Sequence, residues 1–168
     1  MQLSGNNDFY IEKGKDFTTT KMVSSDSTGN IVKLNLVDEL ENISIKEFSS
    51  SHFFDYKDLD NDKIKEYIFV DKNELNIYNQ NKSRLFNHQF EEDIKLAPMF
   101  FLFPDNFGKT GIINSQTKEL WLFDQFGNPF EDIPSKGETT FSIGDINKDG
   151  QLNIIVGSGK NIYAYPVK

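Results

Sequence analysis

The sequence contains no cysteine, only two alanines and few basic residues for its length of 168. Without cysteine the chain can form no disulfide, no thiolate metal site and no cysteine nucleophile. Lys and Arg total 18 against 26 Asp and Glu, and the resulting net charge of −8 repels phosphate backbones. No apolar run reaches the roughly 18 residues that a membrane helix needs. We therefore expect neither a nucleic-acid partner nor a transmembrane segment.

Aromatic and β-branched residues are abundant by contrast. Aromatic side chains make up 14% of the chain and sixteen residues are Phe, although hydrophobic residues as a whole reach only 37%. Phe, Tyr, Ile, Val and Thr fit the pleated surface of a sheet, and the scarcity of Ala removes the best helix former. The composition predicts an all-β fold.

An internal repeat with an offset of 42 to 45 residues runs through the chain. The same apolar alternation recurs in the segments 30–34, 74–78, 119–123 and 161–165. These copies divide a single domain, 1–168, into units at about 8–50, 51–95, 96–137 and 138–168. A period of this length indicates a repeat architecture in which each unit covers the apolar face of its neighbour.

Short apolar runs separated by Asp, Asn and Lys clusters predict the strands within each unit. The expected strands are 9–11, 21–24, 31–36 and 43–48; then 52–56, 67–70, 75–78 and 85–90; then 99–103, 111–114, 120–123 and a short piece near Phe130; and finally 140–143, 152–156 and 162–165. Four-stranded antiparallel sheets at this interval are typical of β-propeller blades. We therefore predict a propeller-like array of about four blades, the last of them incomplete, with a solenoid of stacked sheets as the alternative.

The unfinished last blade leads to two further expectations. We expect the chain to be the C-terminal part of a larger exported protein, because neither end supplies the missing strand. We also expect that an open blade edge allows self-association or pairing with additional sequence.

A loop in the fourth unit has the pattern of a calcium site. Numbered from Asp145, it carries oxygen side chains at positions 1, 3, 5 and 9, a glycine for the bend at position 6 and a backbone carbonyl at position 7. The predicted ligands are Asp145, Asn147, Asp149, Gln151 through its carbonyl, and Asn153. Hard cations such as Ca²⁺ need six or more such oxygens to converge.

The second unit repeats this pattern in the same register. Its predicted ligands are Asp58, Asp60, Asp62, Ile64 through its carbonyl, and Glu66. Lys63 stands where the fourth unit has Gly150, which makes the bend harder to form. The corresponding loops of the first and third units each retain one acid, Asp16 or Asp105, and are predicted to bind no metal.

Of two other interpretations of these loops, ordinary turns stay open and an EF-hand or dockerin loop is rejected. Asp, Asn and Gly runs also mark ordinary turns. An EF-hand or dockerin loop shares the spacing, but it takes an oxygen ligand at position 12 and opens into a helix, whereas position 12 here is Val156 in a β-rich run.

The run from Phe141 to Gly157 resembles the FG-GAP, or VCBS-type, repeat of integrin-α-like β-propellers, and the run from Asp55 to Val70 resembles it more loosely. The resemblance implies a propeller stiffened by calcium, located outside the cytoplasm and serving in adhesion or ligand binding. Propellers of this family usually have about seven blades.

These observations lead to two functional hypotheses. The first is a non-catalytic calcium-binding module, extracellular, on the cell surface or periplasmic, that presents loops to a protein or carbohydrate ligand. The second is the propeller fragment of a secreted polysaccharide-degrading hydrolase or lyase. Such an enzyme needs acids that converge on a central channel, and the best acids here belong to the loops. His52 and His88 have no Cys or Ser motif beside them, so we expect neither to be catalytic or to bind zinc.

Overall fold

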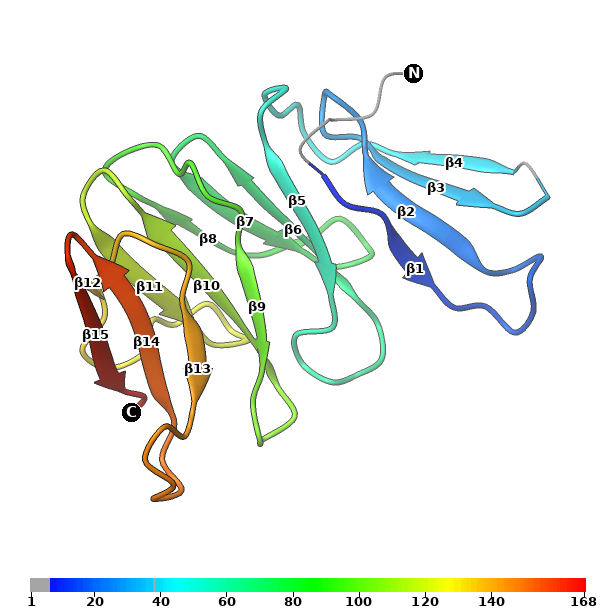
Figure 1. The fold of residues 1–168 in the computed structure, drawn as a ribbon. Helices are drawn as coiled ribbons and strands as arrows, with labels where there is room; N and C mark the ends of the chain where they lie inside the picture. Colours follow the sequence, from blue (N-terminus) through cyan, green and yellow to red (C-terminus); the bar gives the residue numbers. More distant parts are fainter. Residues whose placement is uncertain (1–6, 38) are drawn as a thin grey trace.

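The computed structural model describes residues 7–37 and 39–168, and these fold into four antiparallel sheets with no helix among them. Figure 1 shows the sheets side by side in a curved row. The first sheet contains β1 (Tyr10–Glu12), β2 (Lys21–Ser25), β3 (Ile31–Asn35) and β4 (Leu40–Ile43); the second contains β5 (Phe53–Lys57), β6 (Glu66–Asp71), β7 (Glu74–Tyr78) and β8 (Arg84–Gln89). The third contains β9 (Met99–Leu102), β10 (Gly108–Asn114), β11 (Glu119–Phe123) and β12 (Ser135–Lys136); the fourth contains β13 (Ser142–Gly144), β14 (Asn153–Ser158) and β15 (Asn161–Pro166).

Each sheet is a meander in which only strands adjacent in sequence pair. The strands of each sheet fall within one of the four sequence units, and the fourth sheet has three strands. This confirms an all-β, propeller-like array of about four blades with an incomplete last one. None of the described residues forms a helix long and apolar enough to span a membrane.

The turns after the third strands repeat as the strands do. In each of the first three sheets, one Asn or Asp at this turn accepts hydrogen bonds through Oδ1 from the backbone N–H groups two and four residues later. The three residues are Asn35, Asn79 and Asp124. Such side-chain turns mimic a backbone turn and reverse the chain after the third strand. The sequence repeat is therefore also a repeat of hydrogen-bonded turns in the structure.

Three hydrophobic clusters join the sheets face to face, one between each adjacent pair. The first includes Ile31 of the first sheet and Phe69 of the second, with Phe48 stacked on Phe69 at a centroid distance of 4.1 Å. The second includes Ile77 and Ile112, and the third joins Leu122 to Ile154 and Val156. No such cluster of described residues joins the fourth sheet to the first, which lie at opposite ends of the row (Figure 1). Each blade therefore depends on its immediate neighbours.

Two predicted outer strands lie elsewhere in the structure. The fourth strand of the first sheet is Leu40–Ile43 instead of 43–48, and that of the third sheet is Ser135–Lys136 instead of a segment near Phe130. Residues 40–42 are all exposed, and their position is set by pairing with β3. The sequence therefore has no buried apolar pattern from which this strand could be predicted.

Candidate metal sites

The two loops with predicted ligands have the same backbone conformation. Both connect the first to the second strand of a sheet and lie on the same side of the row (Figure 1). Positions 4 and 6 have positive φ in each: 62° at Asn61 and 74° at Lys63 in the second sheet, 61° at Lys148 and 86° at Gly150 in the fourth. Left-handed backbone at a non-glycine residue is uncommon, so its recurrence in register indicates a common loop.

The same hydrogen bonds hold both loops. Oδ2 of the position 1 aspartate accepts from the N–H of position 6, at 2.9 Å between Asp58 and Lys63 and at 2.8 Å between Asp145 and Gly150. The position 5 aspartate accepts through Oδ1 from the N–H of position 7, at 2.6 Å in the second sheet and 2.8 Å in the fourth. The carboxylates are thus held within the loop by the backbone that they cap.

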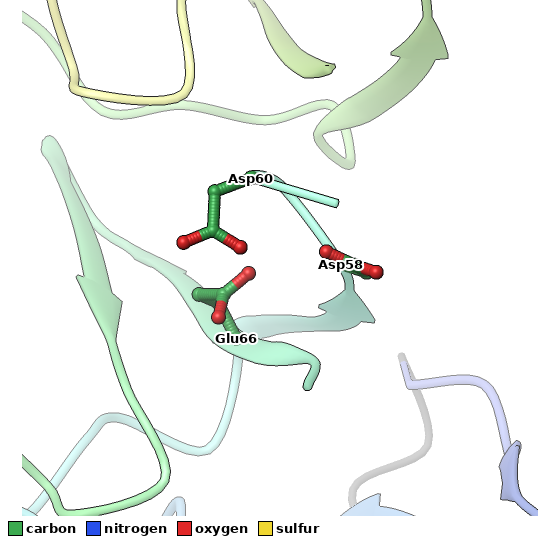
Figure 2. Close-up of side chains that lie close together, drawn as sticks. All are labelled: Asp58, Asp60 and Glu66. Atoms are coloured by element: carbon green, nitrogen blue, oxygen red, sulfur yellow. The ribbon is translucent and has the colours of Figure 1, made fainter. Parts of the chain in front are cut away.

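Three acids of the second-sheet loop form a group that could hold a metal ion. One carboxylate oxygen each from Asp58, Asp60 and Glu66 lies within 4.8 Å of the others. Figure 2 shows Asp58 and Asp60 reaching in from the loop and Glu66 from the start of β6. Asp62 lies outside this group and instead accepts a hydrogen bond from the N–H of Ile64.

Glu66 is the most enclosed acid of the group. It is only 5% exposed, and its Oε2 accepts a hydrogen bond of 2.8 Å from the N–H of Leu59. Burial, together with the negative charges of Asp60, Asp62 and Asp58, raises the pKa of Glu66 to about 7 against the lowering effect of that hydrogen bond. A buried carboxyl beside three other acids is costly to ionise unless a cation neutralises it.

Each loop also contains a buried oxygen with no hydrogen-bond partner among the described residues. These are Oδ1 of Asp58, at position 1, and Oδ1 of Asn153, at position 9. Buried polar atoms are nearly always partnered, so an unpartnered oxygen at a predicted ligand position needs an explanation. A bound cation would supply it at both places, and the residues present therefore fit a metal ion.

The fourth-sheet loop is more open than the second. Asp145, Asn147, Asp149 and Gln151 are all exposed, and Asn153 is half-buried. Asn147 donates a hydrogen bond of 2.8 Å to Oδ2 of Asp149. With two carboxylates and neutral amides, this loop offers fewer charges than its counterpart.

The loop of the second sheet is also tied to the next blade. Leu59, at position 2, is 1% exposed within the cluster between the second and third sheets, and its carbonyl accepts a hydrogen bond of 2.8 Å from the N–H of Gly108. The equivalent residue of the fourth sheet, Ile146, is 57% exposed. An ion in the second-sheet loop would therefore stiffen an interface between blades, a coupling that the sequence pattern did not reveal.

The two loops predicted to bind no metal hold their single acid in other ways. Asp16 accepts hydrogen bonds through one oxygen from the backbone N–H and the hydroxyl of both Thr18 and Thr19. Asp105 pairs with the ammonium of buried Lys109 at 3.2 Å. That ammonium also lies 5.6 Å and 5.4 Å from the ring centroids of Phe103 and Phe107, which occupy positions 1 and 5. In the third sheet, a lysine ammonium therefore lies beside the side chains at positions 1, 3 and 5 of the loop.

The two histidines are held by hydrogen bonds or by packing against aromatic rings. His52 is fully buried, with its ring nitrogens near Ser25 Oγ at 2.8 Å and the carbonyl of Ser49 at 2.6 Å. His88 packs against Phe90 and Trp121, and burial lowers its pKa. Neither belongs to the acid group described above.

No protein-family model matches the chain, and no curated protein matches it. The metal-binding interpretation therefore depends on the loops themselves.

Proposed function

We propose that the protein is a non-catalytic calcium-binding module of the FG-GAP type, located outside the cytoplasm, which presents its loops to a protein or carbohydrate ligand. The observation that carries the proposal is the convergence of Asp58, Asp60 and Glu66 in a loop whose backbone is repeated at Asp145. The metal has a structural role here, because it would fix loops and not react.

The donor set favours calcium over other ions. Every candidate ligand is an oxygen from a carboxylate, an amide or a backbone carbonyl, and neither loop contains histidine. Zinc prefers nitrogen and sulfur ligands, and magnesium usually keeps several waters around one or two carboxylates. Calcium accepts six to eight oxygens in a flexible arrangement, as a loop with several carboxylates and a carbonyl provides.

Thermal unfolding in calcium and in EDTA tests this proposal. Calcium should raise the midpoint, because an ion that binds only the folded chain stabilises it. Asp58→Ala and Asp145→Ala should each remove part of the shift. Magnesium at equal concentration should give a smaller shift, and an unchanged midpoint in calcium would contradict the proposal.

A further inference from the structure

A pocket of about 540 Å³ lies between the first and second sheets, next to the second-sheet metal loop. It is lined by residues of β1 and β5, by Lys13 and Gln80, and by residues 63–65 of the metal loop. The volume is within the range of small-molecule sites, which is about 300 to 1,000 Å³. Charged, polar and apolar side chains all line this pocket.

A closed network neutralises one part of this lining. Glu12 accepts hydrogen bonds of 2.7 Å from Lys33 Nζ and 2.7 Å from the hydroxyl of Tyr56. Lys33 is 5% exposed and also donates a hydrogen bond of 3.0 Å to Oε1 of Gln80. Lys33 thereby neutralises the negative charge of Glu12, so this charge does not repel an anion in the pocket.

Three other lysines give the pocket its charge. Lys13, Lys63 and Lys65 line it, and none of them belongs to an ion pair in the part of the chain that the structure describes. Lys65 donates one hydrogen bond, of 3.0 Å, to the carbonyl of Ile11 and lies 5.2 Å from the ring centroid of Tyr56. Three lysines that form no ion pair among the described residues therefore line one cavity in a protein of net charge −8, which favours an anionic ligand there.

The pocket also has an apolar side. Ile11 is 50% exposed and Ile64 is 53% exposed, and both line it together with the ring of Tyr56. A sugar ring combines a C–H face, which packs on such groups, with substituents that hydrogen-bond to ammonium groups. An acidic peptide would instead be expected along a free strand edge or an extended groove.

We propose that this pocket binds an acidic saccharide, a sugar that carries a carboxylate or sulfate, and that calcium in the adjacent loop strengthens the binding. The coupling rests on the proposed function. Lys63 and Ile64 are positions 6 and 7 of the metal loop, and the N–H of Lys63 is held by Asp58. Calcium would fix these two residues and cancel loop charge that repels an anion.

Isothermal titration calorimetry with digalacturonic acid, in calcium and in EDTA, tests the inference, with the neutral disaccharide galactobiose as the matched ligand. The acidic disaccharide should bind and the neutral one should not. Binding should be several-fold tighter in calcium and should weaken as salt is added. Equal binding of both disaccharides, or tighter binding of an acidic dipeptide, would overturn the assignment.

Variants that remove a positive or a negative charge from the pocket are expected to have opposite effects on binding. Lys13→Gln and Lys65→Gln should each weaken binding about ten-fold, the usual effect of losing a hydrogen bond to a charged group. Glu12→Gln should tighten it, because the charge of the nearby Lys33 is then no longer neutralised by Glu12. Lys160→Gln, an exposed lysine on the fourth sheet, makes the same change in net charge and should have no effect. If Glu12→Gln fails to fold, exposed Lys13 still decides the outcome.

The failures of the two proposals are distinguishable. A calcium-dependent rise in the unfolding midpoint without saccharide binding overturns only the pocket. Saccharide binding of equal strength in calcium and in EDTA overturns the coupling. The absence of any calcium effect on the unfolding midpoint overturns the proposed function itself.

Discussion

Glu66 is the residue at which the cost of a metal-free loop is greatest. Its carboxyl is buried, faces three other acids and keeps one hydrogen bond from Leu59. In the calcium-free protein its pKa is about 7, above the 4.5 of an ordinary glutamate. The folded state therefore binds more protons than the unfolded state between these values, and its stability falls as the pH rises through 7.

Glu66→Gln should separate the two consequences of this charge. Without calcium at pH 8 the variant should be more stable than the parent, because the amide can still accept the hydrogen bond of Leu59 and carries no charge. Below pH 5 the advantage should vanish. With calcium, the variant should lose most of the stabilisation contributed by this loop. Denaturant unfolding at both pH values, with calcium and with EDTA, measures all three; a variant less stable than its parent at pH 8 in EDTA would contradict the argument.

The free-energy cost of positive φ can be measured at position 6 of the two metal loops. Lys63 and Gly150 both adopt positive φ, and a Cβ at Gly150 would have no atom within 4 Å. Steric crowding is therefore not part of the cost. Gly150→Ala should destabilise the EDTA-treated protein by about 1 kcal/mol, and Lys63→Gly should stabilise it by up to about 1 kcal/mol. Urea unfolding checks both, and changes of the same sign would refute the common conformation.

At the level of single elements, the third-sheet loop, which is predicted to bind no metal, holds its single acid with a buried lysine. Lys109 is 2% exposed, bonds to Asp105 and to Gln125 Oε1 at 2.8 Å, and lies near two aromatic rings. Removing Asp105 leaves a buried ammonium with a neutral partner. Because Asp105 is itself about half-exposed, the loss is far smaller than for a fully buried pair.

Asp105→Ala should accordingly lower stability by about 1 kcal/mol in both calcium and EDTA, without changing the difference between them. Asp145→Ala, at position 1 of a metal loop, should act mainly on that difference. Thermal unfolding of both variants in the two conditions makes the comparison. A reduced calcium effect in Asp105→Ala would mean that the third loop also binds an ion.

The sequence predicts the buried third strands well and two of the outer strands poorly. The third strands expected at 75–78 and 120–123 are Glu74–Tyr78 and Glu119–Phe123, because their alternating apolar residues face neighbouring blades. The outer strands of the first and third sheets lie elsewhere, because exposed edges carry no such pattern.

The candidate sites divide in the same way. The ligand register of the metal loops could be predicted because those ligands lie within nine residues of one another. The ammonium of Lys109 in the third loop, the anchor at Leu59 and the network of Lys33, Glu12 and Gln80 arise from packing between distant segments. A local pattern holds no information about them.

For the whole molecule, the arrangement of the blades determines where stability is lost first. Within residues 7–37 and 39–168, the first and fourth sheets each share a hydrophobic cluster with one neighbour, whereas the second and third share clusters with two. In such a linear array stability is close to a sum of unit and interface contributions, so the end blades should open at lower free energy than the middle. Calcium bound at Asp145 would stabilise the fourth sheet, at one end of the row, against such opening.

A matched pair of isoleucine substitutions tests this nearest-neighbour behaviour. Ile31 is fully buried between the first two sheets, and Ile154 is 2% exposed between the last two. Truncation to alanine should weaken either interface by about 2 to 5 kcal/mol. Hydrogen exchange measured by mass spectrometry should then show Ile154→Ala loosening β13–β15 and Ile31→Ala loosening β1–β4, with β6 and β7 least affected in both. Calcium should restore protection at 142–158 in Ile154→Ala, because its loop lies within that segment. Uniform loss of protection across all four sheets would instead mean that the row unfolds as one unit.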